Sequence, residues 1–241
     1  MGTGTYAALF SGGKDSYLAL DLAREAGYQV EALLTVDAPS GSHLYHTPAL
    51  LATSAIADAL DIEHHRIEVP TEAVASSRPS TEAAERELTP LIDWLDGRLE
   101  SSPPVLDGIV SGVVASRYQH TRLDRVCEER ALEFVSPLWG WTGEEVLQAV
   151  ADRSISADIV AVAAEGLDRS WVGRRLDSSA IDELGELADR YGLHPAGEGG
   201  EFETLVVDAP AFEFPIHYDG SVEWAGDRGH MELTAVGIES A

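Results

Sequence analysis

The stretch Thr5–Ser16, TYAALFSGGKDS, decides the fold. Its first six residues form an apolar run that stops at a pair of glycines, which is typical of a buried strand. Apolar residues then recur at helical spacing over Ser16–Ala26, and Gly27 provides a C-terminal stop. A buried strand, a glycine turn and a helix in succession predict the first unit of a parallel α/β sheet.

The same alternation continues up to residue 142. Strands separated by helices imply right-handed crossovers, so we expect residues 1–142 to form an α/β domain with a doubly wound parallel sheet. The alternating polarity of Glu63–Val69 predicts a strand nearer the sheet edge. The further strands are expected at Val30–Val36, Glu63–Val69, Gly108–Val113 and Phe134–Leu138, and the helices at Pro48–Leu60, Thr81–Leu99 and Arg117–Ala131.

The pattern changes after residue 142. Two helical stretches flank one strand, and a tail rich in β-forming residues follows, so residues 143–241 are predicted to form a smaller α+β domain. The helices are expected at Gly143–Asp152 and Ser178–Tyr191, and the strands at Asp158–Val162, Glu203–Val207, Phe212–Tyr218, Val222–Trp224 and Met231–Ile238.

The charge of the chain is unusually negative. Its 241 residues carry 16 basic and 42 acidic side chains, a formal net charge of −26, and Lys14 is the only lysine. Self-repulsion of this size is screened at ~1 M salt, where the screening length falls to about 3 Å. We therefore expect a protein adapted to high salt, with an ordinary acidic protein as the alternative. A lysine kept alone among 15 arginines indicates a role that arginine cannot fill.

Several classes of protein are disfavoured by the composition. No apolar run approaches the ~20 residues of a membrane helix, and no basic stretch precedes the first apolar segment as in a signal peptide. Cys127 is the only cysteine, so neither an internal disulfide nor a cysteine-rich zinc site is expected. The negative charge disfavours direct binding of nucleic acid. We expect a cytoplasmic protein with no membrane partner.

The segment Ser11–Ser16, called the phosphate loop below, has the features of an anion site. Gly12 and Gly13 allow a sharp turn with exposed amides, and the helix that follows points its positive end at the same place. Lys14 supplies a positive charge and the two serines supply hydroxyl donors. The Asp15 carboxylate would repel a bound anion unless a cation lay between them. Its presence in the loop therefore points to a Mg²⁺-bound polyphosphate. The spacing differs from Walker A and from GxGxxG; a plain loop with an N-cap serine is the alternative.

A second motif lies in Pro195–Phe212, PAGEGGEFETLVVDAPAF. Strand alternation puts Glu201 and Glu203 on one face, with Phe202 buried opposite, and Glu198 lies just before them. Carboxylates this close repel unless they share a metal, a cation or a proton. In so acidic a protein, a solvated strand edge is the alternative interpretation. Gly197–Thr204, GEGGEFET, is called the glutamate segment below.

Both motifs resemble those of known families. SGGKDS directly after the first strand resembles the loop of the PP-loop ATP pyrophosphatases, the adenine nucleotide α-hydrolase-like group, and the glutamate segment with its VxDAPxF continuation resembles the C-terminal signature of the diphthine–ammonia ligase family. Asp37–Gly41 and Gly140–Thr142 depart from the family wording. Further blocks that match in family order are Ser42–Pro48 (SHLYHTP), Ser111–Gln119 (SGVVASRYQ), Pro137–Trp139 (PLW), Ser170–Arg174 (SWVGR) and Tyr191–Pro195 (YGLHP).

The resemblance implies ATP-dependent amidation of the diphthine carboxylate on translation elongation factor 2. A carboxylate resists attack by ammonia because its leaving group would be an oxide. Its attack on the α-phosphate of ATP would give an acyl-adenylate and pyrophosphate, and ammonia would then displace AMP. ATP and Mg²⁺ are the expected cofactors, and Asp15 is the expected metal-binding residue.

The expected site residues combine this resemblance with position along the chain. For three of them a structural role is the alternative: His46 and Ser116 as helix caps, and Arg174 as one half of a surface ion pair. Lys14, Asp15 and Glu201 are expected to be catalytic; Ser11, Gly12, Gly13, Lys14, Asp15, Ser16, Leu34, Thr35 and Val36 to bind ATP; and His46, Ser116, Tyr118, Gln119, Arg174, Glu198, Glu201, Glu203 and Thr204 to bind the substrate.

The three glutamates are expected to hold a cation. Diphthine carries a trimethylammonium group, which carboxylates and aromatic faces attract. Our hypothesis is that Glu198, Glu201 and Glu203 hold this group or the incoming ammonium rather than a catalytic metal.

Cys127 bears on the source of ammonia and on alternative functions. It lies on the apolar side of Arg117–Ala131 with Leu123, Val126 and Ala131, so we expect a core residue and free ammonium as the nitrogen donor. The lack of catalytic cysteines also disfavours a tRNA-thiolating enzyme. Amidation of a small-molecule carboxylate and a non-catalytic nucleotide sensor remain as alternative functions.

Overall fold

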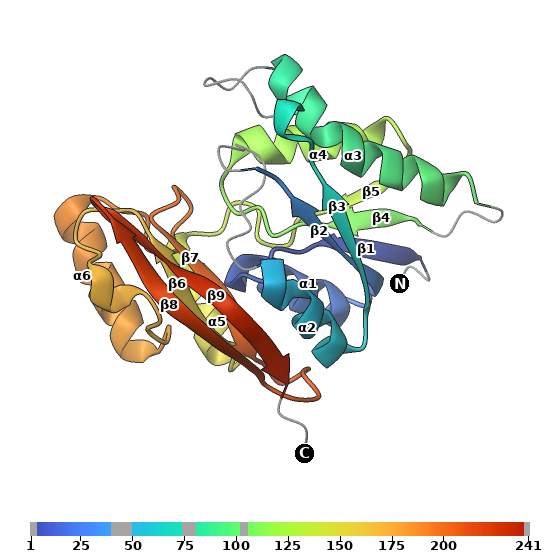
Figure 1. Cartoon of the computed structure of the whole chain (residues 1–241). Coiled ribbons are helices and arrows are strands. Elements are labelled where there is room, and N and C mark those ends of the chain that lie inside the picture. The colour runs from blue at the N-terminus through green and yellow to red at the C-terminus, as the bar shows by residue number, and fades with distance from the viewer. Residues whose placement is uncertain (1–3, 40–49, 74–80, 102–105, 239–241) are drawn as a thin grey trace.

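The computed structural model describes residues 4–39, 50–73, 81–101 and 106–238. Within them, the N-terminal part forms a five-stranded sheet in the order β3-β2-β1-β4-β5 (Figure 1). Every strand pair in this sheet is parallel, as expected. Its strands are β1 (Thr5–Leu9), β2 (Gln29–Asp37), β3 (Glu63–Glu68), β4 (Gly108–Val110) and β5 (Glu133–Val135), and its helices are α1 (Lys14–Glu25), α2 (Leu50–Leu60), α3 (Thr81–Leu99) and α4 (Arg117–Glu128).

The strand order creates a switch point beside β1. The chain starts in the middle of the sheet, builds β2 and β3 on one side, and then returns to build β4 and β5 on the other. Loops leaving the carboxyl ends of β1 and β4 therefore run in opposite directions and leave a crevice between them. The strand at Glu63–Glu68 lies at the sheet edge, which confirms its predicted position.

The C-terminal part forms a four-stranded antiparallel sheet in the order β7-β6-β9-β8. The sequence interpretation of two short strands, Phe212–Tyr218 and Val222–Trp224, is wrong, because one continuous strand runs from Ile216 to Ala225 and residues 212–215 precede it. The pair Asp219–Gly220, which resembles a turn in sequence, is a local register shift within this strand. The strands are β6 (Ser156–Val162), β7 (Phe202–Asp208), β8 (Ile216–Ala225) and β9 (Arg228–Ile238), and the helices are α5 (Gly143–Asp152), the 3₁₀ helix η2 (Arg169–Trp171) and α6 (Ser178–Tyr191).

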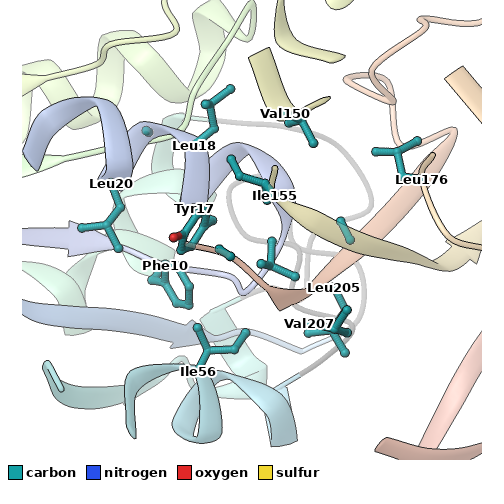
Figure 2. Packing of buried hydrophobic residues seen from close by; sticks show 14 of the residues in the cluster. Phe10, Tyr17, Leu18, Leu20, Ile56, Val150, Ile155, Leu176, Leu205 and Val207 are labelled. Carbon is teal, nitrogen blue, oxygen red and sulfur yellow. The ribbon is translucent and has the colours of Figure 1, made fainter. Parts of the chain in front are cut away.

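One hydrophobic core joins the two sheets. Helices α1 and α2 lie between them, while α6 covers the outer face of the antiparallel sheet (Figure 1). Phe10, Tyr17 and Ile56 from the N-terminal part pack in the same cluster as Leu205 and Val207 from β7 (Figure 2). The expected boundary at residues 142–143 falls where parallel strands give way to antiparallel ones, but the core continues across it.

A second core lies on the opposite face of the parallel sheet, under α3 and α4. Cys127 is 1% exposed in this core, as expected, and burial raises the pKa of its thiol to about 12. Leu123 and Val126 pack beside it, whereas Ala131 does not. Helix α4 ends at Glu128, and Ala131 is exposed with a φ of 54°, so it leaves the apolar face. No helix in the described ranges is long and apolar enough to cross a bilayer.

Candidate functional site

The phosphate loop connects β1 to α1 at the switch point of the sheet. Gly12 has a φ of +80°, a left-handed conformation that side-chain-bearing residues rarely adopt. Gly13 is the extended N-cap, so α1 begins at Lys14, two residues before the predicted start at Ser16. The earlier start puts Lys14 and Asp15 in the first helical turn, where the positive end of the helix dipole favours anions.

The two serine hydroxyls of the loop close it internally. The Ser16 hydroxyl donates to the Gly13 carbonyl at 2.9 Å and lies 3.2 Å from the Ser11 hydroxyl. The amide of Gly13 donates to the Ser11 Oγ at 3.4 Å. These bonds hold the loop in one conformation, which lowers the entropy cost of ordering it when a ligand binds.

The segment after β4 presses directly against the start of α1. A Cβ atom on Gly112 would lie 2.7 Å from the carbonyl carbon of Asp15 and 2.8 Å from the amide of Ser16. Only glycine tolerates such a close approach of two backbones. Gly112 therefore allows the β4 loop to form the second wall of the crevice beside the phosphate loop.

The Lys14 side chain points into the junction between the two sheets. It is 2% exposed, and its Nζ donates to the Ala196 carbonyl at 2.6 Å and to Asp15 Oδ2 at 2.9 Å. The ammonium also lies 5.1 Å from the centre of the Phe202 ring. These three partners lie in the phosphate loop (Asp15), just before the glutamate segment (Ala196) and within that segment (Phe202). The lone lysine thus connects the two motifs.

Asp15 has one engaged and one free carboxylate oxygen. Oδ2 accepts from Lys14, whereas Oδ1 is buried and has no hydrogen-bond partner among the described residues. A buried acceptor without a partner is costly, and a bound cation would satisfy it. Over the same residues, no group of three or more His, Cys, Asp or Glu side chains is arranged to hold a metal ion. A cation at Asp15 would therefore need further ligands from a bound molecule.

Strand β7 fixes the phosphate loop from the other side. The Val206 amide donates to the Gly12 carbonyl at 2.8 Å, and the Lys14 amide donates to Thr204 Oγ1 at 3.0 Å. Thr204 is 4% exposed, and through this hydrogen bond it positions the start of α1 from the end of the glutamate segment. Two motifs separated by about 180 residues in sequence are thereby held in one unit.

Glu201 has a different place from the one expected. Its Oε1 accepts from the His194 amide at 2.9 Å, and its Oε2 accepts from the Gly199 amide at 2.7 Å. The carboxylate therefore braces the loop that precedes β7 instead of facing the crevice. Phe202 is buried, as the alternation predicts.

Glu198 and Glu203 do face the crevice. Burial, with the nearby Asp15 charge as the next cause, raises the pKa of Glu198, whose Oε2 accepts from the Ala115 amide at 3.2 Å. Burial also raises the pKa of Glu203 to about 7; Lys14 opposes this shift, and Asp15 and Glu198 add to it. Together with Asp15, these two glutamates place three carboxylates around one crevice, and this arrangement favours a cation.

These elements surround a cavity of about 330 Å³. It lies at the carboxyl ends of β1, β2 and β4, which is where doubly wound sheets bind ligands, and its size is within the range of small-molecule sites. The predicted site residues that line it are Ser11, Asp15, Ser16, Leu34, Val36, Ser116, Gln119, Glu198 and Glu203.

The other predicted site residues of the described part do not line this cavity: Gly12, Gly13, Lys14, Thr35, Tyr118, Arg174, Glu201 and Thr204. Thr35 is fully buried and donates from Oγ1 to the Phe10 carbonyl at 2.8 Å, so it links β2 to β1. The Tyr118 ring packs under the Arg122 guanidinium, 3.6 Å away, beside the second core.

Arg174 is also outside the cavity lining. Its two terminal nitrogens donate to the Glu183 carboxylate at 2.8 and 2.7 Å, and its guanidinium lies 4.3 Å from the centre of the Trp171 ring. This is the surface ion pair that the sequence left as the alternative. His46 lies outside the described residues. Ser116 is the N-cap of α4, accepting from the Gln119 amide at 3.4 Å, and also lines the cavity.

Sequence reasoning missed several residues of the cavity wall. Ser111 and Gly112 follow β4 as Ser11 and Gly12 follow β1, so a Ser-Gly pair leaves both strands at the switch point. That repeat was a usable signal. Ala196 contributes only its carbonyl to Lys14, and no side-chain pattern could have revealed it.

Family models match both parts of the chain, the part that contains the phosphate loop and the part that contains the glutamate segment. Residues 4–134 match the family model described as the diphthamide synthase N-terminal domain, and residues 142–237 match the one described as the diphthamide synthase C-terminal domain. Two curated relatives, each named diphthine–ammonia ligase, come from Bos taurus and Homo sapiens. They are 33% and 32% identical to this chain, over 89% of it and 83% of their own length.

Other comparisons are weaker. A protein of the same name from Schizosaccharomyces pombe is 31% identical over 85% of this chain, which spans 34% of that longer protein. A solved structure described as a predicted tRNA methyltransferase subunit from Methanocaldococcus jannaschii has a TM-score of 0.48 at 16% identity, covering 86% of this chain and 98% of that one. That similarity is too low to carry a functional argument.

Proposed function

This chain belongs to the diphthamide synthase family, and from that premise we propose that it is a diphthine–ammonia ligase, which uses ATP to join ammonia to the carboxylate of diphthine. We further propose that the diphthine is carried by translation elongation factor 2. The observation that carries this proposal is the cavity that the phosphate loop and the glutamate segment line together. Beside it, the buried Lys14 ammonium links the loop to the Ala196 carbonyl, just before the glutamate segment.

The proposed reaction has two steps. A carboxylate oxygen of diphthine attacks the α-phosphorus of ATP; the new O–P bond forms as the bond to the β-phosphate oxygen breaks, and pyrophosphate leaves. Ammonia nitrogen then attacks the acyl carbon, AMP leaves with its oxygen, and the nitrogen loses a proton to give the amide. Free ammonium is the proposed nitrogen source, because buried Cys127 with its raised pKa is unsuited to act as a glutaminase nucleophile.

The phosphate loop would bind the terminal phosphates. The amides at the start of α1 and the Lys14 ammonium offset negative charge that accumulates on the departing pyrophosphate. Asp15 would hold Mg²⁺ through the oxygen that lacks a partner, and the ion would supply further positive charge to the phosphates when bound. Leu34 and Val36, at the end of β2, provide the apolar wall for adenine.

Glu198 and Glu203 would receive the positive charges of the second half-reaction. Both carboxylates line the same cavity as Asp15, and their raised pKa values reflect burial beside like charges. A cationic group, either the trimethylammonium of diphthine or the incoming ammonium, would relieve that repulsion. Ser116 and Gln119 at the start of α4 complete the substrate side, while Glu201 positions the segment that carries the other two glutamates.

The test follows the products. Purified protein in high KCl is mixed with ATP, Mg²⁺ and ammonium, with and without elongation factor 2 bearing diphthine, and AMP, pyrophosphate and ADP are measured. The expected result is AMP and pyrophosphate in equal amounts, formed only with the modified factor, together with diphthamide on the factor by mass spectrometry.

Two outcomes would contradict the proposal. ADP as the product would exclude the adenylation step. Turnover with a small carboxylate but none with the modified factor would assign the same chemistry to another acceptor. Unmodified elongation factor 2 is the matched control.

A further inference from the structure

A second cavity of about 220 Å³ adjoins the first. It is lined by residues of β6 and by the starts of β7 and β9. Gly200 and Glu203 line both cavities, so the Glu203 carboxylate forms part of the wall between them. A ligand in the second cavity could therefore reach the first past a single side chain.

The strand register places three side chains on this cavity. Ala161 of β6 pairs with Glu203 of β7 on one side and with His230 of β9 on the other. Directly paired residues project on the same face of a sheet, so these three side chains are neighbours. The small Ala161 methyl between them leaves the space that the cavity occupies.

The walls are mainly apolar, and Glu203 is the acidic group among them. Within the described part of the chain its carboxylate makes no hydrogen bond, although it borders an interior crevice. Arg228 and His230 also line the cavity, but their side chains are largely exposed: Arg228 is 71% exposed, 3.7 Å from Asp227, and His230 is 53% exposed, 3.4 Å from Glu232. Among the side chains that line the cavity, Glu203 is therefore the one carboxylate, and Ala161, Val162, Ala163 and Phe202 are apolar.

This chemistry selects between cations. Ammonium carries four N–H donors, and burying it beside one carboxylate and apolar walls leaves donors without partners. A quaternary ammonium has no N–H group and presents methyl groups outward, so apolar walls and one carboxylate satisfy it. We propose that the second cavity binds the trimethylammonium group of diphthine, with Glu203 as its counter-charge and Ala161 setting the space available.

The inference rests on the proposed function and refines the role of one residue. Diphthine carries its trimethylammonium and its carboxylate on the same carbon. With the cationic group against Glu203, the carboxylate lies on the side of the first cavity, where the phosphate loop would present ATP. Glu203 is then a specificity residue for the methylated substrate, whereas Glu198, which lines only the first cavity of the two, is not.

The experiment uses the full chain with elongation factor 2 bearing diphthine. Ala161→Leu fills the second cavity without lining the first, Glu203→Gln removes its charge, and Ala235→Leu, on an exposed part of β9, is the matched control. KM values for the factor and for ammonium are measured for every variant. The Kd for ATP of Ala161→Leu and of Ala235→Leu tests whether these two variants are folded. Betaine and its neutral-centre isostere 3,3-dimethylbutanoate are compared as inhibitors.

The expected result is a rise of about tenfold in the KM for the factor in Ala161→Leu and Glu203→Gln, with the KM for ammonium and the ATP Kd of Ala161→Leu unchanged. Betaine should inhibit at least tenfold more strongly than the isostere, and Ala161→Leu should remove that difference. If wild type amidates the factor but both variants keep its KM within twofold, the inference is overturned. A rise confined to the KM for ammonium also overturns it and assigns the cavity to ammonium. Absence of amidation by wild type would instead contradict the proposed function.

Discussion

At the scale of single residues, Lys14 has the most constrained position in the site. An ammonium fits between the Ala196 carbonyl and Asp15 Oδ2, at 2.6 and 2.9 Å, in a place that is 2% exposed. A guanidinium is wider and planar and needs its donors satisfied in a fork, so arginine does not fit the same contacts. This geometry gives a physical reason for one lysine in a chain whose other strong cations are all arginine.

Lys14→Met should reduce AMP release by roughly 10²–10³-fold, because the positive charge opposite the departing pyrophosphate is lost. Lys14→Arg should fail to restore the rate, owing to the enclosed site. Steady-state AMP release, with Tm as the control for folding, checks both. A Lys14→Met variant that turns over ATP as wild type does would refute the assigned role of the loop.

Glu203 should make stability depend on pH near neutrality. Its pKa of about 7 in the folded chain exceeds the ordinary 4.5, so the folded state holds a proton that the unfolded state releases between these values. Its stabilising contribution is present below pH 4.5 and is lost as pH rises through 7. At pH 8 the wild-type carboxylate is ionised at an unfavourable site, so Glu203→Gln should raise the free energy of unfolding by about 2 kcal/mol, a figure reduced for the partial exposure of the side chain. At pH 4 the wild-type carboxyl is protonated in both states, so the substitution should change the free energy of unfolding little.

Chemical denaturation of both proteins between pH 4 and pH 8 at constant KCl measures this difference. Glu31→Gln, at an exposed position on β2, is the control for removing any one carboxylate from so acidic a protein. A gain in stability that is equal at pH 4 and pH 8 would count against a raised pKa at Glu203.

At the scale of elements, the segment before β7 connects the two halves of the site. The Glu201 carboxylate accepts two backbone amides of this segment, and the Ala196 carbonyl of the same segment accepts from Lys14. Sequence alternation suggested that Glu201 faces the substrate, but the chain turns before β7 begins at Phe202, so strand alternation does not extend to it. Its effect on chemistry is therefore indirect.

Glu201→Gln should weaken ATP binding and use of the modified factor together. The side-chain nitrogen of glutamine would replace one carboxylate oxygen and would face a backbone N–H group, of His194 or Gly199. Two donors that face each other cost about 1–3 kcal/mol and loosen the segment that holds Lys14. ATP Kd, KM for the factor and Tm are the measurements, with Glu223→Gln on β8 as control. Loss of factor binding with an unchanged ATP Kd and Tm would show that Glu201 contacts the substrate directly.

At the scale of the whole molecule, the acidic surface surrounds two cores. One core runs through α1 and α2 from the parallel sheet to β7, so the junction that carries the site is also the largest packed region described (Figure 2). The net charge of −26 opposes this compact arrangement through long-range repulsion. Stability should therefore depend on the ionic strength of the solvent.

Raising KCl from about 0.2 M to about 2 M should raise Tm, since the screening length falls to a few ångströms. Differential scanning calorimetry at several KCl concentrations measures the effect, and sucrose at matched osmolality separates screening from general exclusion of solute. A Tm that stays constant or falls with KCl would contradict adaptation to high salt.

The sequence by itself determined most of the elements and the family. Apolar periodicity located the strands and helices of the parallel sheet within a few residues, because the strand and helix repeats differ and each buried element keeps its repeat. The phosphate loop was recognisable because its turn at Gly12 and its helix start after Gly13 depend on local backbone geometry, which adjacent residues specify.

Only the tertiary structure decided which predicted residues meet. Arg174 and Glu201 found partners in Glu183 and in backbone amides, and Ala196 entered the site through a carbonyl. The second cavity arises from the register of three strands around Ala161, two of which are far from it in sequence. Contacts of this kind depend on how separate elements pack, and a local pattern of side chains contains no information about the partner that packing will bring to it.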